Sequence, residues 1–143
     1  MPAPDSRIAE FINEHHVLTL ATCADGQPYC ASCFYVYLPE EQIFVFTSDL
    51  ETRHGQESQA NHQVAASIVL ETKTVGKIQG LQITGTVALG TDDFFDHARM
   101  AYLKAFPFAV LKPASLWLLR ANYFKLTDNR LGFGKKIIWT QEN

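Results

Sequence analysis

A short helix is predicted near the start of the chain, where Ile8, Phe11 and Ile12 repeat with the i, i+3, i+4 spacing of one helix face. Asp5 or Ser6 stands where a capping residue is needed, and the pattern ends near residue 15. We expect this helix to lie as a lid on a larger structure.

Strand-like patterns follow the predicted helix. Asp25-Gly26 separates two β-rich runs and is a strong hairpin signal, which would place Cys23 across from Pro28. Gly80 and Gly85 interrupt one long run at points where a curved sheet could bend. The predicted strands cover residues 17–23, 29–37, 43–47, 64–70, 78–89, 116–119, 123–126 and 136–139.

Two further helices are predicted between these strands. The polar residues 49–62 are interpreted as a helix because Ser48 and Glu51 form an S-x-x-E capping box. Residues 92–105 give a clearer pattern, with apolar side chains on one side and Pro107 just beyond the end. These strands, with two or three short helices, predict a mainly β fold, a small closed or half-open antiparallel barrel.

Composition indicates one domain, residues 1–143, since 47% of residues are hydrophobic and no linker or repeat divides the chain. Lys plus Arg number 12 against 15 Asp plus Glu, a formal charge of −3, which argues against nucleic acid or an anionic membrane as the principal partner. No uncharged stretch approaches the roughly 20 residues that span a bilayer. The N-terminal residues do not form a signal peptide, so we expect a cytoplasmic protein.

The sequence offers no metal site. Cys30-Ala31-Ser32-Cys33 has the C-x-x-C spacing of redox pairs and zinc half-sites, but residues three apart on a strand point to opposite faces, which favours structural packing over catalysis or metal binding. The five histidines show no metal-ligand spacing, and no H-E-x-x-H or G-x-S-x-G motif occurs. With Cys23, three cysteines in a chain lacking an export signal suggest free thiols.

Residues 46–55 carry the chemistry of a phosphate site. A strand delivers Thr47 and Ser48 to the start of a helix, and Arg53 follows one turn later. Helix N-termini, hydroxyl groups and arginine all donate hydrogen bonds to phosphate oxygens. The alternative is that Ser48 only caps the helix while Arg53 pairs with Glu51 or Glu57 on a solvated face, and spacing alone does not separate the two readings.

The same segment resembles the flavin-binding split-barrel superfamily typified by pyridoxamine 5'-phosphate oxidase, in which a Tyr-Thr or Thr-Ser pair ends a strand and precedes Ser-Arg-Lys. Thr47-Ser48 and Thr52-Arg53-His54 match that pattern, and the order of elements fits over nearly the whole chain. More narrowly, the chain is similar to the YhbP-like family of bacterial proteins assigned to this superfamily. The narrower likeness rests on Lys73-Thr74-Val75, Thr127-Asp128-Asn129 and Leu131-Gly132-Phe133-Gly134-Lys135-Lys136.

The resemblance implies an antiparallel split β-barrel of the FMN-binding type. It implies that Thr47, Ser48, Arg53 and His54 hold the FMN phosphate, that Ser32, Cys33 and Phe34 line the isoalloxazine, and that Gln79 lies near the ring. The oxidase pattern has an Arg and a Lys where this chain has Ser32 and Tyr37, and a Lys where it has His54. We therefore expect a less basic site and do not expect pyridoxamine oxidase activity.

Two functions remain open at this stage. The first is an FMN-dependent oxidoreductase that acts on an unknown small molecule, with the protein orienting the flavin. The second is a non-catalytic module that binds or sequesters a flavin, a deazaflavin or haem, because one fold hosts many functions. In both cases a small barrel fills its own interior, so we expect a homodimer with the cofactor in a groove between subunits and the Trp117 and Trp139 regions as the partner wall.

Overall fold

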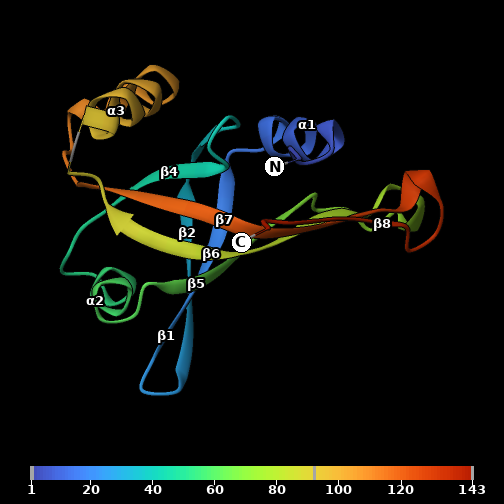
Figure 1. The fold of residues 1–143 in the computed structure, drawn as a ribbon, viewed down its shortest axis with the longest axis horizontal. Coiled ribbons are helices and arrows are strands. Elements are labelled where there is room, and N and C mark those ends of the chain that lie inside the picture. The colour runs from blue at the N-terminus through green and yellow to red at the C-terminus, as the bar shows by residue number, and fades with distance from the viewer. Residues whose placement is uncertain (1, 92, 143) are drawn as a thin grey trace.

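The computed structural model describes residues 2–91 and 93–142, and these form three helices, three short 3-10 turns and eight strands. Figure 1 shows their arrangement. In chain order the elements are α1 Ser6–Glu14, β1 Val17–Ala24, β2 Gln27–Phe34, β3 Val36–Leu38, β4 Ile43–Ser48, α2 Arg53–Ala60, β5 Gln63–Val69, η1 Val75–Lys77, β6 Gln79–Leu89, α3 Asp93–Ala105, η2 Pro107–Val110, β7 Ser115–Asp128, η3 Asn129–Leu131 and β8 Lys136–Thr140.

All strands belong to one antiparallel sheet with the order β2-β1-β5-β6-β7-β4-β3, and β8 pairs with β7 beside this path. The sheet curls into a half-barrel, which confirms the predicted fold class (Figure 1). α1 packs over one end of the curl and α2 over the other, beside the β1–β2 hairpin. α3 covers part of the outer surface next to β3 and β4.

Local sequence signals explain the first third of the structure. Asp5 caps α1 by accepting the Arg7 backbone N–H at 2.9 Å, as the capping rule predicts. Asp25 and Gly26 both have positive φ, 52° and 75°, which is the conformation of a two-residue hairpin turn. The resulting register places Cys23 opposite Pro28, as predicted.

Three predicted element boundaries are wrong. The predicted capping box is not formed, since α2 begins at Arg53 and its cap is Thr52 rather than Ser48. The predicted strand 29–37 is broken at Tyr35, whose backbone N–H and hydroxyl both donate to the end of the α1 segment. Residues 116–119 and 123–126 belong to one strand, β7, because Asn122 is accommodated by a register shift opposite Thr84 and Gly85. The start of the predicted helix 92–105 lies outside the described residues.

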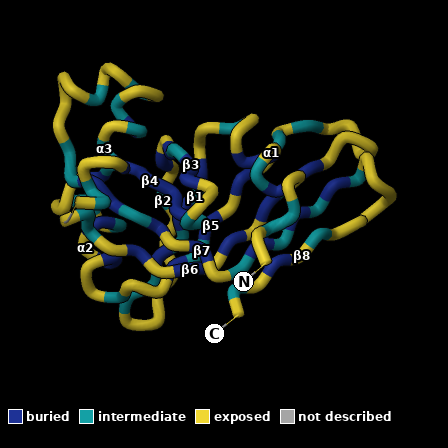
Figure 2. The backbone as a smooth tube through the Cα atoms, turned by 45° about the horizontal axis from the view of Figure 1, so that its top comes forward, coloured by how far each residue is buried: buried dark blue, intermediate teal, exposed yellow. Residues whose placement is uncertain are grey.

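Two apolar clusters hold the sheet, and β4 takes part in both. Phe44 and Phe46 face the barrel interior, while Ile43 and Val45 lie under α3. β4 is therefore buried on both faces, unlike β2, whose residues are mostly exposed. In Figure 2 the buried positions follow the strands, and the loops at the two long ends are exposed. None of the described helices is long and apolar enough to cross a membrane.

Candidate functional site

The predicted phosphate residues lie where β4 ends and α2 begins. The Ser48 hydroxyl and the His54 Nε2 are hydrogen-bonded, and Thr52 Oγ1 lies 3.5 Å from the same nitrogen. Two hydroxyl groups and one imidazole thus gather at the N-terminus of an eight-residue helix. Such a donor set suits phosphate oxygens, because the helix terminus adds the positive end of its dipole. We call Ser48, Thr52, Arg53 and His54 the phosphate cluster.

Gly55 lets the connecting loop fold tightly onto the helix. A Cβ atom at this position would lie 2.5 Å from the Asp49 carbonyl oxygen and 2.9 Å from Thr52 Oγ1. That carbonyl accepts the Thr52 hydroxyl at 2.8 Å and the Thr52 N–H at 3.2 Å, and Thr52 Oγ1 accepts the Gly55 N–H at 3.1 Å. A side chain at residue 55 would therefore disturb the loop that brings the members of the phosphate cluster together.

Arg53 has two partners inside the protein. Its Nε lies 3.3 Å from Glu57 Oε2, and its guanidinium lies 4.1 Å from the centre of the Tyr29 ring. Glu57 is buried and also accepts a long 3.4 Å hydrogen bond from Thr22. The predicted Arg53–Glu57 ion pair is present. The Arg53 side chain is 53% exposed, while the buried Glu57 also contacts Thr22 and so links α2 to β1.

The electrostatics of the cluster are mild. Burial lowers the pKa of His54 below its ordinary value, and the nearby Glu57 carboxylate opposes that shift. The ion pair with Glu57 offsets the charge of Arg53, which limits the net positive charge of the phosphate cluster.

Thr47 points to the opposite side of β4 from Ser48 and joins an aromatic cluster. Its hydroxyl donates to the Tyr102 hydroxyl of α3 at 3.2 Å. The Tyr102 ring lies 5.1 Å from Phe106, which in turn lies 5.2 Å from the exposed Phe34. Among the predicted site residues, Thr47 and Phe34 are therefore linked to each other through the rings of Tyr102 and Phe106. They are not linked to Ser48 in this way.

The remaining predicted residues of β2 divide between the two faces of the sheet. Ser32 is exposed on the outer face, while Cys33 is buried in the core, and burial raises its pKa to about 11. Cys30, the other half of the C-x-x-C spacing, is exposed. The geometric objection to a paired-thiol site is confirmed, because the two cysteines face opposite sides.

Gln79 lies at the far end of the barrel. It opens β6 opposite Asp128, which ends the 14-residue strand β7, whereas Ser48 pairs with Ser115 at the start of that strand. At about 3.3 Å per residue this is roughly 45 Å of strand. The structure therefore does not bring Gln79 to the phosphate cluster.

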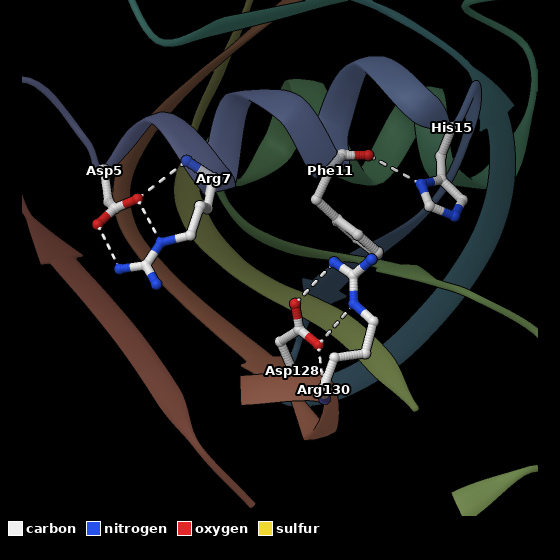
Figure 3. Close-up of polar contacts among 6 residues, drawn as sticks. All are labelled: Asp5, Arg7, Phe11, His15, Asp128 and Arg130. Atoms are coloured by element: carbon white, nitrogen blue, oxygen red, sulfur yellow. Dashed lines mark hydrogen bonds and ion pairs between the residues drawn. The ribbon is translucent and has the colours of Figure 1, made fainter. Parts of the chain in front are cut away.

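The Gln79 side chain instead lines a separate cavity of about 290 Å³ beneath α1. It is 6% exposed, and no hydrogen bond to its amide is found in the described part of the chain. Two ion pairs flank the cavity, Asp5 with Arg7 and Asp128 with Arg130, both at 2.9 Å (Figure 3).

The outer face of the sheet contains two adjoining cavities that sequence reasoning did not predict. Their volumes are about 400 and 480 Å³, and Ser67 and Gln82 border both. Small side chains such as Ala21, Ala65 and Thr19 line the first cavity. Trp117 and Trp139, by contrast, are 1% and 7% exposed, so their own side chains pack within the barrel.

Sequence reasoning missed Tyr102 as a neighbour of Thr47, Thr52 as the cap of α2, and the burial of Glu57. The i, i+4 spacing of Arg53 and Glu57 was a usable signal for the ion pair, but nothing local indicates that Glu57 is buried or that Tyr102 reaches Thr47. In the described residues no group of three or more His, Cys, Asp or Glu side chains is placed to hold a metal ion.

Comparisons with known proteins are consistent with this structure. The family model described as pyridoxamine 5'-phosphate oxidase matches residues 4–122. The UPF0306 protein plu4501 of Photorhabdus laumondii is 39% identical over 92% of this chain and 92% of its own length, and the UPF0306 protein YhbP of Salmonella arizonae is 38% identical over 95% and 92%.

Solved structures that share the fold include two haem proteins. A heme binding protein from Mycobacterium smegmatis superposes with a TM-score of 0.78 at 21% identity, covering 91% of this chain and 55% of the other. HutZ, the heme storage protein from Vibrio cholerae, gives 0.67 at 19% identity, covering 84% and 91%. Fold, family match and close relatives agree, and the chain belongs to the YhbP-like UPF0306 group of the pyridoxamine 5'-phosphate oxidase-like family.

Proposed function

We propose that this protein binds FMN and acts as a flavin-dependent oxidoreductase on a small molecule. The observation that carries the proposal is the phosphate cluster, in which Ser48 and His54 meet across a tight loop at the N-terminus of α2. Family membership supports the choice of a flavin as the phosphorylated ligand. When bound, FMN would supply hydride or electron transfer.

Ser48, Thr52 and the N-terminal N–H groups of α2 would donate hydrogen bonds to the phosphate. Arg53 would add a charged contact to the phosphate. To do so, its guanidinium has to bind the phosphate together with Glu57, whose Oε2 lies 3.3 Å from its Nε, or break that ion pair. The exposed Phe34 and the outward-facing Ser32 offer contacts for a ring on the outer surface. The buried Cys33 would support the strand from inside the barrel.

We further propose a cytoplasmic homodimer that pairs through the outer face of β1, β5 and β6. The small side chains around the first outer cavity allow close approach of a second sheet, and a ring on this face would need the partner to exclude water. Sedimentation at micromolar concentration should show a dimer. A monomer that retains its cofactor would remove this part of the proposal.

The test of flavin binding starts from purified protein. We expect a yellow protein that releases FMN on denaturation, identified by mass spectrometry, and that is bleached by NADH or NADPH with turnover. Ser48→Ala should weaken FMN binding about tenfold or more, because a hydrogen bond to a charged group is worth about 1.5–3 kcal/mol. Ser6→Ala, at an exposed position outside the cluster, is the matched control and should leave binding unchanged.

Non-catalytic haem binding is the second candidate, since two proteins of similar fold are named for heme binding and heme storage. His16 is exposed, its ring lies 6.3 Å from Phe34, and it borders a cavity of about 310 Å³ between α1 and α3. Titration with haemin followed by absorbance, in the parent and in His16→Ala, distinguishes this function. Stoichiometric haemin binding that depends on His16, without FMN binding, would replace the flavin proposal.

A further inference from the structure

The fold gathers positive charge and exposed apolar side chains at one end of the molecule. Two loops, residues 70–78 and 129–136, meet there and project beyond the barrel (Figure 1). Together they carry five cations and one acid, a formal charge of +4, which becomes +3 when Asp128, the partner of Arg130, is counted with them; the whole chain has a formal charge of −3. We call these two loops the basic tip.

Four lysines account for the unbalanced charge of the basic tip. Lys73, Lys77, Lys135 and Lys136 are all exposed. The fifth cation, Arg130, is neutralised by Asp128, whose oxygens accept two hydrogen bonds from its guanidinium at 2.9 and 3.1 Å (Figure 3).

Apolar side chains stand among these lysines. Phe133 is 87% exposed, Val75 54%, Leu131 42% and Ile78 38%. Four such residues in two adjoining loops form a patch of the kind that marks an interaction surface, whereas single exposed apolar residues are ordinary.

The outward position of Phe133 is fixed by ordered structure. The flanking Gly132 and Gly134 have φ values of 138° and 69°, which only glycine adopts without strain. Asn129 ties the turn together, because its Oδ1 accepts the Gly134 N–H at 3.0 Å and its Nδ2 donates to the Val75 carbonyl of the other loop at 2.8 Å. The loops thus hold Phe133 away from the core.

We propose that the basic tip binds the surface of an anionic lipid membrane, with Phe133 inserted among the headgroups and the lysines contacting lipid phosphates. The charge complements an anionic bilayer, and apolar residues interleaved with lysines match an interfacial anchor. Nucleic acid fits less well, because three of the four exposed apolar residues are aliphatic and offer no base-stacking surface.

The experiment measures co-sedimentation of the full chain with phosphatidylcholine vesicles containing 30% phosphatidylglycerol, a composition chosen as the probe. We expect binding at low salt that weakens as salt is added, and little binding to pure phosphatidylcholine. Lys135→Gln with Lys136→Gln should weaken binding about 30-fold, since each lysine near an anionic surface is worth about a factor of five. Lys104→Gln with Lys112→Gln removes the same charge elsewhere and should change binding less than twofold.

A second readout follows insertion itself. The tryptophan emission of Phe133→Trp should shift to the blue when anionic vesicles are added. The emission of the native Trp117 and Trp139 should not shift, because both side chains are already buried. Phe133→Ser should lower vesicle binding about tenfold. Absence of binding to anionic vesicles would overturn the proposal, as would binding that the tip variants leave unchanged. Binding to a single-stranded oligonucleotide that needs the lysines but not Phe133 would assign the tip to nucleic acid instead.

Discussion

Replacing Gly55 by alanine should destabilise the protein by about 2 kcal/mol. The new Cβ would start 2.5 Å from the Asp49 carbonyl oxygen, a backbone atom already held by two hydrogen bonds from Thr52. Overpacking of this kind costs about 1–3 kcal/mol, and loss of the Thr52 cap adds about 1 kcal/mol. The better helix propensity of alanine returns up to about 1 kcal/mol, which does not offset the clash.

Urea denaturation at one fixed protein concentration measures this difference as a lower transition midpoint at unchanged slope. Gly76→Ala is the matched control, because a Cβ at residue 76 would meet nothing within 4 Å, and it should change the free energy of unfolding by less than about 0.5 kcal/mol. The same loop shift should move Ser48 relative to His54 and weaken FMN binding in Gly55→Ala. Equal stability of the two variants would refute the tight loop around Gly55 and the geometry of the phosphate cluster with it.

Four further predictions concern titration and charge. A phosphate dianion beside His54 favours the imidazolium, so FMN affinity should fall as the pH rises through the pKa of His54 in the complex, and His54→Lys should flatten this loss. Without FMN, burial lowers the pKa of His54. The free protein should therefore lose stability as the pH falls from about 6.5 toward the lowered pKa. Identical pH profiles of stability for the parent and His54→Gln would contradict this prediction. At pH 8, and at a concentration low enough to keep the chain monomeric, a thiol reagent should modify the exposed Cys30 rapidly and the buried Cys33 slowly. Three thiols should be found after denaturation under non-reducing conditions; finding one would reveal a disulfide. Glu57→Gln should release Arg53 toward the phosphate and strengthen FMN binding about threefold at some cost in stability, whereas weaker binding would show that Glu57 positions Arg53 productively.

Elements whose structure depends on neighbouring residues along the chain were predicted well from the sequence. The Asp5 cap and the Asp25-Gly26 turn act through neighbouring residues, so α1 and the register of the first hairpin could be read from the chain. The break at Tyr35 could not, because it depends on hydrogen bonds to His16 and Ile12 that only the folded α1 segment provides.

The candidate site was predicted less completely for the same physical reason. Strand periodicity indicates that Thr47 and Ser48 face opposite sides, but it does not show that Tyr102 covers Thr47 or that His54 reaches Ser48. The family resemblance implied that Gln79 lies near the flavin ring. In the structure Gln79 pairs with the last residue of β7, whereas Ser48 pairs with the first residue of that strand. The composition did not predict the positive charge of the basic tip, because the formal charge of −3 is a sum over the whole chain and the fold separates the cations of the tip from most of the acids.

The position of β4 in the sheet has a consequence for how the protein is made. β4 is apolar on both faces. Among the described residues its pairing partners are the three-residue β3 and β7, and β7 begins at Ser115. As the chain leaves the ribosome, the pairs β1–β2, β1–β5 and β5–β6 can form first. β4 stays unpaired on one edge until β7, from the last part of the sequence, has been synthesised. The aggregation-prone stage of synthesis should therefore end when β7 emerges, and chains that stop before it should depend on chaperones to stay unaggregated.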